Sequence, residues 1–213
     1  MSFLSAKSIQ DRSHQIFDPA FVPDEKAWQP SSVELRLGGE AFLSGEKELV
    51  ILGAEKPDIK IKPGNFAILL TKEKVKIPTN LMGFISIKSK YKWSGLVNIS
   101  GFHVDPGWEG HLTFSVYNAG PSEIILRKDE KIFVIFFAKL DKETELYKGG
   151  NQYQRHISSE IMNRVMGKSV SPFELEDRLK SLETNVRFQW GLLISAVVGI
   201  ILLFLRYLIK GIS

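Results

Sequence analysis

The chain has 213 residues, enough for one ordinary domain with an appendage but not for two full domains. Its 28 Lys and Arg residues against 24 Asp and Glu residues give a net charge of +4, which is too small by itself to indicate nucleic-acid binding. Hydrophobic residues make up 44% and charged residues 24% of the chain, which excludes global disorder. Because cysteine is absent, a disulfide framework, a thiolate zinc site and a cysteine nucleophile are excluded as well.

Short apolar runs broken by turn residues fill residues 30 to 140, after a short helix expected at Ser5–Gln15. The runs have the length and composition of strands, and Pro, Gly, Asn and Asp lie between them. They read VELRLG, ELVILG, NFAILLT, MGFISI, LVNIS, LTFSVYN, EIILR and KIFVIFF. Strands at this spacing predict a mainly β fold, a barrel or jelly roll. Another short helix is expected at Ser158–Met166.

A further helix is expected to begin near Ser171, which can cap it, with Pro172 in its first turn and Glu174 completing a capping box. A seam with heptad-like spacing follows, made of Leu175, Leu179, Leu182 and Val186. This spacing predicts a coiled-coil stalk of about two heptads. The alternative is a single amphipathic helix that lies on the domain or on a membrane surface.

The stretch Phe188–Leu205, FQWGLLISAVVGIILLFL, contains no charged residue and is bounded by Arg187 and Arg206. A bilayer core of roughly 30 Å needs about 20 helical residues, so a transmembrane helix is predicted over residues 188–209. The alternative is a buried core helix, although such a helix normally keeps a polar face. Small residues recur every fourth position at Gly191, Ser195 and Gly199. This stripe favours self-association of the spans.

These patterns predict four parts: a β domain over residues 1–157, a helical linker and stalk over 158–187, the span over 188–209 and a short tail over 210–213. The start, MSFLSAKSIQDRSHQ, has no apolar core, so a signal peptide is not expected. We therefore expect a single-pass protein with a C-terminal tail anchor and a cytoplasmic bulk. Positive charges on both flanks of the span leave its orientation open.

Several segments follow one another in the order of a known family. They are Leu4–Ile9, Gln29–Gly38 (QPSSVELRLG), Lys62–Pro78, Val104–Gly110 (VDPGWEG), Tyr117–Gly120 (YNAG) and Tyr153–Gln154. Together they resemble the dCTP deaminase branch of the trimeric dUTPase superfamily, with Glu34 where that family has Asp. The resemblance covers roughly residues 3 to 155. It implies a dUTPase-like β-barrel, a homotrimer, and nucleotide sites at the subunit boundaries.

Two positions that carry chemistry in the resembled family differ here. Deamination of a cytosine ring without metal needs a carboxylate that activates water. The family supplies a Glu on the strand before the Tyr-Asn-x-Gly turn, and Ser115 stands at that position. The family also has an Arg four residues after the Ser of its phosphate motif, where this chain has Trp93. Both replacements predict that the chain is not a deaminase.

The positions that bind nucleotide in the resembled family match this sequence better than the positions that carry its catalysis. The candidate nucleotide-binding residues are Lys88, Ser89, Lys90, Asp105, Trp108, Tyr153 and Gln154. In the resembled family the Lys88–Lys90 stretch meets the triphosphate, and charge-assisted bonds to phosphate are strong. The alternative for this stretch is a solvated basic strand edge.

Asp105 stands where a dUTPase orients its attacking water, but it can equally be a turn-forming Asp before Pro106. The Gln that a dUTPase has late in its barrel is Val134 here. No catalytic residue, metal site or cofactor is expected, and Mg²⁺ is expected only as a companion of bound nucleotide.

The first hypothesis is a membrane-anchored, catalytically inactive dCTP deaminase-like homotrimer. It binds a nucleotide or nucleotide-like signal and acts as a nucleotide-responsive membrane effector. One alternative is an active but divergent dCTP deaminase or dUTP diphosphatase tethered to the membrane. Another is a purely structural membrane protein. A nucleic-acid partner is not expected.

Overall fold

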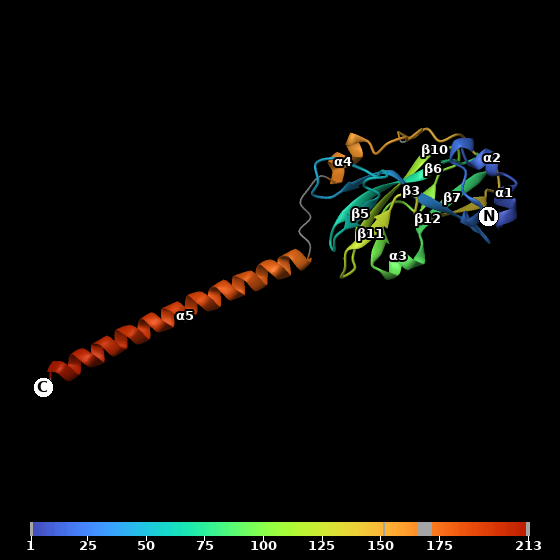
Figure 1. The fold of residues 1–213 in the computed structure, drawn as a ribbon. Coiled ribbons are helices and arrows are strands. Elements are labelled where there is room, and N and C mark those ends of the chain that lie inside the picture. The colour runs from blue at the N-terminus through green and yellow to red at the C-terminus, as the bar shows by residue number, and fades with distance from the viewer. Residues whose placement is uncertain (1, 151, 166–171, 212–213) are drawn as a thin grey trace. The chain divides into compact units, whose positions relative to one another are not determined.

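The computed structural model describes residues 2–150, 152–165 and 172–211. They fall into two compact units, Met1–Ser169 and Val170–Ser213 (Figure 1). The first unit carries the strands, and the second is built around one long helix.

The first unit is built on a curled antiparallel sheet with strand order β8-β10-β6-β3-β12-β7-β9. These strands are β3 (Ser32–Leu43), β6 (Phe66–Lys76), β7 (Leu81–Ile87), β8 (Leu96–Asn98), β9 (His103–Val104), β10 (Glu109–Asn118) and β12 (Lys131–Lys139). Short strands extend it, namely β1 (Ser2–Phe3) on β12 and both β2 (Trp28–Gln29) and β4 (Val50–Ile51) on β3. Strands β5 (Asp58–Ile61) and β11 (Ile124–Arg127) form a separate ribbon. The predicted mainly β class is confirmed.

Short helices surround the sheet, and the helix expected at Ser5–Gln15 is two helices, α1 (Ala6–Gln10) and α2 (Ser13–Ile16). The turn between them brings Phe17 into a bridge with Val75 of β6, which a single straight helix does not allow. The remaining short helices are η1 (Pro19–Phe21), η2 (Glu25–Ala27), α3 (Ser89–Trp93) and α4 (Ser159–Val165). The last residue expected in the second predicted helix, Met166, lies outside the described residues.

The main core lies inside the curled sheet. Along β10 the side chains alternate between buried and partly exposed, as a strand with one face in the core requires. Phe114 of β10 and Phe133 of β12 stack across the interior with their ring centroids 4.1 Å apart. Burying a side chain of this size contributes roughly 1.5–3 kcal/mol. The inward-facing side chains of β10 are therefore fixed by core packing. Its other side chains are partly exposed and can contribute to a site.

A smaller cluster on the outside of β3 and β6 holds α4 against the sheet. Phe42, Ile68 and Leu70 form the sheet side, Ile157 is buried with them, and α4 adds apolar side chains from its own face. Those side chains are Ile161, Met162 and Val165. The folded unit therefore continues through α4 to Val165, at the far end of the sheet from the N-terminus (Figure 1).

The backbone after α3 meets the turn after β10 at very short range. Gly95 has φ +93°, and a Cβ there would lie 2.3 Å from the Cα of Gly120, so neither position accepts a side chain. The buried Asn118 fixes the same turn, because its Nδ2 donates to the carbonyl oxygens of Ile61 at 2.8 Å and Ser122 at 2.9 Å. The end of α3 is thus clamped to the turn that follows β10.

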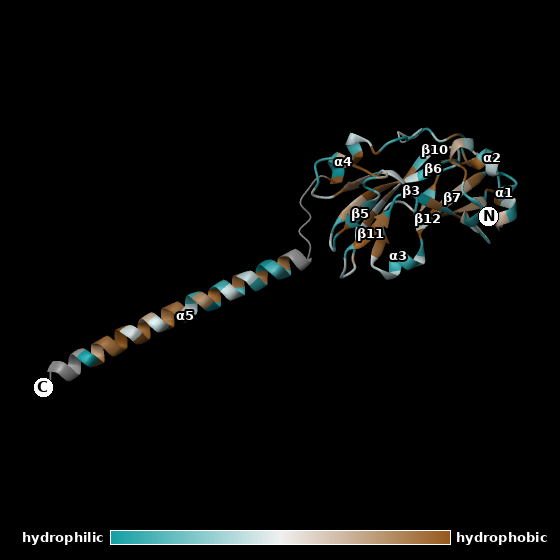
Figure 2. Ribbon diagram, in the orientation of Figure 1, coloured by the Kyte–Doolittle hydropathy of each residue, from teal (hydrophilic) through white to brown (hydrophobic). Residues whose placement is uncertain are grey.

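The second unit is a single helix, α5 (Pro172–Gly211), of 40 residues. Its stretch Leu175–Arg206 is, among the described residues, the one helical segment long and apolar enough to cross a membrane. Figure 2 shows that α5 changes from mixed polarity near its start to mostly hydrophobic further along. The cap predicted at Ser171 lies outside the described residues. The seam from Leu175 to Val186 is exposed in the single chain, and the coiled coil stays a prediction.

Candidate functional site

A pocket of about 190 Å³ opens where β7, β9 and β10 meet the chain that follows β12. It is lined by Ile85, Ser100, Gly101, His103, Val104, Asp105, Trp108, Leu112, Thr113, Tyr147 and Gln154. Three of the predicted site residues, Asp105, Trp108 and Gln154, therefore come together although they are far apart in sequence.

The turn from Asp105 to Trp108 shapes one wall of this pocket. The backbone nitrogen of Trp108 donates to the carbonyl oxygen of Asp105 at 3.2 Å, and Gly107 takes φ +81°. A Cβ on Gly107 would lie 2.7 Å from the backbone nitrogen of Tyr147, so only glycine fits. The Asp105 carboxylate is half exposed and lies 3.5 Å from Nε2 of His103. The turn thus presents an acid and a histidine at the pocket mouth.

Residues 152–154, which we call the strap, cover the start of β10. The Gln152 side chain donates to the carbonyl oxygen of Gly107 at 2.9 Å, and the Glu109 backbone nitrogen donates to its Oε1 at 3.2 Å. The Tyr153 nitrogen donates to the Glu109 carbonyl at 2.7 Å, and the His111 nitrogen donates to the Gln154 carbonyl at 2.9 Å. These four hydrogen bonds hold the strap as a short extra layer along β10.

The two predicted residues of the strap have different surroundings. The Gln154 amide donates to the hydroxyl of Thr113 inside the pocket. Tyr153 has φ +60°, and its side chain is 61% exposed and does not line the pocket. Gln152 was not among the predicted residues, because a polar residue after two glycines gives no sequence signal of its bonds to the turn.

Lys88, Ser89 and Lys90 lie elsewhere on the same unit, at the start of α3, and do not line this pocket. The Lys88 ammonium pairs with the Glu34 carboxylate of β3. The Lys90 ammonium lies 3.2 Å from Glu130 Oε1 and 4.5 Å from the centre of the Tyr91 ring. Both predicted phosphate-binding cations therefore already have a carboxylate partner in the single chain.

Glu130 is held at this spot as a carboxylate. Its burial acts to raise its pKa, but hydrogen bonds from the Tyr91 hydroxyl, at 2.5 Å, and from the Arg127 nitrogen outweigh burial and lower the pKa. Burial and the Glu130 carboxylate both raise the pKa of Tyr91, so Tyr91 stays a neutral donor. The negative charge beside Lys90 is thus a fixed feature of the site.

The two replaced chemical positions lie on different surfaces. Ser115 is on the partly exposed face of β10, the face that also carries Thr113, and its carbonyl accepts the Ile99 nitrogen at 2.8 Å. Trp93 ends α3 with 84% of its surface exposed. Asp105 is the single acidic residue among those that line the pocket. Within the described parts of the chain, no group of three or more His, Asp and Glu side chains is arranged to hold a metal ion.

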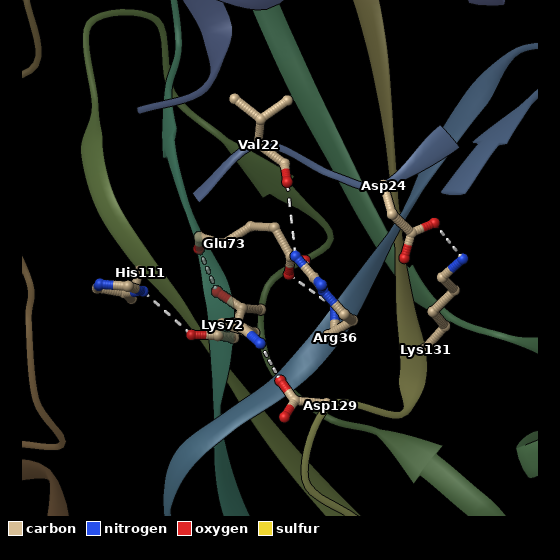
Figure 3. A network of polar contacts seen from close by, with 9 residues as sticks. Val22, Asp24, Arg36, Lys72, Glu73, His111, Asp129 and Lys131 are labelled. Atoms are coloured by element: carbon tan, nitrogen blue, oxygen red, sulfur yellow. Dashed lines mark hydrogen bonds and ion pairs between the residues drawn. The ribbon is translucent and has the colours of Figure 1, made fainter. Parts of the chain in front are cut away.

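A buried ion pair joins β3 to β6, the strand next to β10 (Figure 3). Glu73 of β6, 0% exposed in its side chain, accepts the Arg36 backbone nitrogen at 2.7 Å and the Arg36 Nε at 2.6 Å. Burial raises the pKa of Glu73, and the Arg36 guanidinium opposes that rise. Next to it, the Thr71 hydroxyl accepts the Leu112 nitrogen at 2.9 Å, and the Thr71 carbonyl lies 3.1 Å from His111 Nδ1. This network links β3, β6 and β10 beneath the strap.

Comparison with known proteins agrees with this architecture. A family model described as dCTP deaminase-like matches residues 3–140. A dCTP deaminase of Pyrococcus abyssi is 36% identical over 135 residues, covering 62% of this chain and 84% of the relative. A dCTP deaminase of Thermococcus kodakarensis is 31% identical over 135 residues, covering 63% and 84%.

Among solved structures, the 2′-deoxycytidine 5′-triphosphate deaminase of Agrobacterium tumefaciens matches with a TM-score of 0.55 and 17% identity. The match covers 63% of this chain and 48% of that chain, so it spans about half of the solved relative and bears on the fold alone. The predicted fold class and family are confirmed by these matches. The chain belongs to the dCTP deaminase-like family.

Proposed function

We propose that this chain is a membrane-anchored, catalytically inactive member of its family that binds a nucleotide or nucleotide-like ligand and acts as a nucleotide-responsive membrane effector. The observation that carries the proposal is Ser115, which occupies the position where the resembled family has its catalytic Glu. A serine hydroxyl does not take a proton from water near neutral pH unless a base activates it. No histidine or carboxylate among the described contacts of Ser115 supplies that base.

The pocket supports binding. It combines the indole of Trp108 with hydroxyl and amide groups of Ser100, Thr113 and Gln154. Pockets for small ligands typically pair an apolar wall with a few convergent polar groups. In its own chain this pocket has no lysine or arginine among its lining residues. We propose that the missing positive charge comes from a neighbouring subunit of the homotrimer that the family resemblance implies.

The segment after the strap, up to the end of α4, contacts the domain at several successive points. After the strap, Glu40 of β3 accepts the Ile157 nitrogen at 2.9 Å and lies 2.5 Å from His156 Nδ1. Helix α4 then packs on Phe42 and Ile68. A ligand that tightens the strap acts on the docked segment that ends with α4 at Val165. A ligand shifts such a balance only by binding its two states unequally.

The pair of Asp105 and His103 favours a second candidate, residual nucleotide hydrolysis. Asp105 stands where the resembled dUTPases orient their attacking water, and His103 Nε2 lies 3.5 Å from it. The candidate lacks a second carboxylate in the pocket. Incubation with dUTP and Mg²⁺ distinguishes it from the first proposal.

The first experiment measures turnover. The purified full chain in detergent is incubated with dCTP, and separately with dUTP and Mg²⁺, with the dCTP deaminase of Pyrococcus abyssi as positive control. Loss of a positioned general base costs a factor of about 10²–10⁴, so no dUTP or dUMP is expected within ordinary assay times. Turnover of either substrate on the order of 1 per second refutes the inactive assignment.

The second experiment tests the effector role. Cells express the wild type or a variant with Lys88, Lys90 and Lys92 all changed to Ala while their nucleotide pools are changed, and membrane permeability is followed with a dye. Wild type is expected to change permeability in at least one condition and the variant in none. If both proteins leave permeability unchanged throughout, the chain is a passive tether.

A further inference from the structure

Beside Trp93 the domain has a recess of about 380 Å³ that is separate from the pocket of Asp105 and Trp108. Its lining consists of Trp93, Ser94, Pro121, Ser122, Glu123, Ile124 and Ile125. Ligand sites typically span roughly 300–1,000 Å³, so the recess is large enough for one flat ring. An exposed indole, an apolar floor and a rim of hydroxyls and one carboxylate are the groups that hold a nucleobase, because the base stacks on one side and forms hydrogen bonds at its edge.

The lysines in the segment that leads to Trp93 are largely neutralised. Lys88 pairs with Glu34, and Lys90 pairs with Glu130, whose carboxylate is also held by Tyr91. Lys92 alone of the three lysines around α3 has a neutral contact, donating to the Ser86 hydroxyl at 2.7 Å. The two carboxylates therefore offset two of the three ammonium charges.

This charge balance separates two classes of ligand. A triphosphate that reaches Lys88 and Lys90 also comes close to Glu34 and Glu130, and like charges near a protein surface repel each other strongly at such short range. A phosphodiester carries one negative charge and needs one free cation, which Lys92 provides. Trp93 is a second reason to expect a phosphodiester and not a triphosphate. An indole at the end of α3 can stack on a base, but it does not neutralise phosphate charge.

We infer that the ligand of α3 is a dinucleotide joined by a phosphodiester, with one base stacked on Trp93 in the recess and the phosphate at Lys92, and not a nucleoside triphosphate. The inference rests on the proposed function, since it names the chemical class of the nucleotide. Linear and cyclic dinucleotides share this chemistry. Either one presents a second base that a triphosphate lacks.

The test measures binding to the full chain in detergent micelles by titration calorimetry. The probes are the linear dinucleotide CpC, cyclic dinucleotides with purine and with pyrimidine bases, dCMP, and dCTP with Mg²⁺. At least one dinucleotide is expected to bind tenfold or more tightly than dCTP. Trp93→Ala is expected to weaken that binding by about tenfold or more, and Trp93→Phe, which keeps an aromatic ring, by less than about threefold.

A variant that removes one of the two carboxylates is expected to favour dCTP. Glu130→Gln keeps the shape of the side chain and removes the negative charge beside Lys90, so dCTP binding is expected to tighten while dinucleotide binding changes little. The mass of each variant in micelles is measured in parallel. Trp93→Ala is expected to keep the assembly of the wild type, because the inference assigns the exposed indole to the ligand.

The outcomes separate this inference from the proposed function. If dCTP binds as tightly as every dinucleotide, or if Trp93→Ala leaves dinucleotide binding unchanged, the inference is wrong while nucleotide binding stands. If Trp93→Ala breaks the assembly, Trp93 belongs to a subunit interface and the inference is again wrong. If no nucleotide binds at all, both fail.

Discussion

The side-chain nitrogen of Gln152 donates a hydrogen bond to the carbonyl oxygen of Gly107, 2.9 Å away. The same side chain accepts a hydrogen bond from the backbone nitrogen of Glu109 at 3.2 Å. One amide therefore closes the turn that carries Asp105 and Trp108 and fastens the strap to it. Gln154 of the same strap lines the candidate pocket, so this contact helps to hold a pocket residue in place.

Gln152→Ala is expected to loosen the strap without unfolding the domain. Two hydrogen bonds are lost, each worth about 0.5–1.5 kcal/mol net. The amides of His111 and Tyr153, which bond across the strap, are then expected to exchange their hydrogens several times faster. Hydrogen exchange followed by mass spectrometry measures this, with Gln10→Ala on the exposed surface as control. Equal exchange in the two variants contradicts the prediction.

The buried pair of Arg36 and Glu73 predicts a large loss of stability when one partner is removed. Glu73→Ala leaves the guanidinium buried without its partner, and such losses are about 3–5 kcal/mol. The double variant Arg36→Met/Glu73→Leu removes both charges and is expected to be less damaging than Glu73→Ala alone. Denaturant unfolding of a chain ending at Ser169 measures both. A double variant that loses as much stability as Glu73→Ala, or more, contradicts this expectation.

Lys74 predicts a dependence of stability on pH. Its hydrogen bonds to Glu109 and Asp18 raise the pKa of Lys74, and the Ala20 backbone N–H and then Lys74 lower the pKa of Asp18. Stability from Asp18 is present above its unfolded pKa of about 3.8 and is lost as the pH falls through its lower folded pKa. Stability from Lys74 is present below about 10.5 and is lost as the pH rises through its higher folded pKa.

The free-energy gap between wild type and Lys74→Met is therefore expected to be widest near neutral pH and to narrow at both extremes. Thermal unfolding of the chain ending at Ser169, measured from pH 3 to pH 11, tests this. Lys47→Met, at an exposed position that has no partner among the described ion pairs, is the control. A gap of constant width across the range contradicts the assignment.

An aromatic cluster predicts where subunits meet. Phe102 and Phe3 are 66% and 61% exposed, and each contacts the ring of Phe84, at 6.2 Å and 5.6 Å between centroids. Exposed aromatic groups of this kind are typical of protein interfaces. The chain ending at Ser169 is expected to have the mass of three chains, and Phe102→Asp to reduce it to one. Ile51→Asp, at another exposed apolar position, serves as control, and a wild type that is a monomer at micromolar concentration ends the trimer proposal.

The span predicts the partition of the protein between cell fractions. Deleting Phe188–Ser213 removes most of the apolar length of α5 and is expected to move the protein from the membrane fraction to the soluble fraction. A variant with Gly191, Ser195 and Gly199 all changed to Leu keeps the hydrophobicity and is expected to stay in the membrane. Full-length protein found wholly in the soluble fraction contradicts the anchor.

Local patterns predict the strands well and their ends poorly. The run NFAILLT marks β6, but the strand continues through the charged residues Lys72, Glu73 and Lys74 to Lys76. A charged run usually indicates a solvated turn. Here it stays in the sheet because Arg36, 37 positions earlier, neutralises the one charge that points inward. No local pattern contains that partner.

The candidate site shows the same limit. The sequence was enough to predict the Asp105 turn and Gln154. Both were recognised from short motifs, because turn-forming residues and the segments that carry the resemblance lie close together in the chain. The carboxylates that pair with Lys88 and Lys90 come from β3 and from the turn before β12, which only the folded sheet brings to α3. The sequence indicated two cations, Lys88 and Lys90, and folding places one carboxylate beside each of them.

The contact between Gly95 and Gly120 has a kinetic consequence. Since two backbones in contact hold the end of α3 against the turn after β10, the recess beside Trp93 exists before any ligand arrives. Binding there needs no slow rearrangement, so the observed association rate is expected to rise in proportion to ligand concentration without a plateau. The strap, in contrast, moves only when its hydrogen bonds to β10 and to the Gly107 carbonyl break, so any strap movement is expected as a second phase whose rate does not depend on ligand concentration. Ligand binding at the recess and movement of the strap are then two separate kinetic steps. The time between them is expected to depend on the strap's hydrogen bonds and not on ligand concentration.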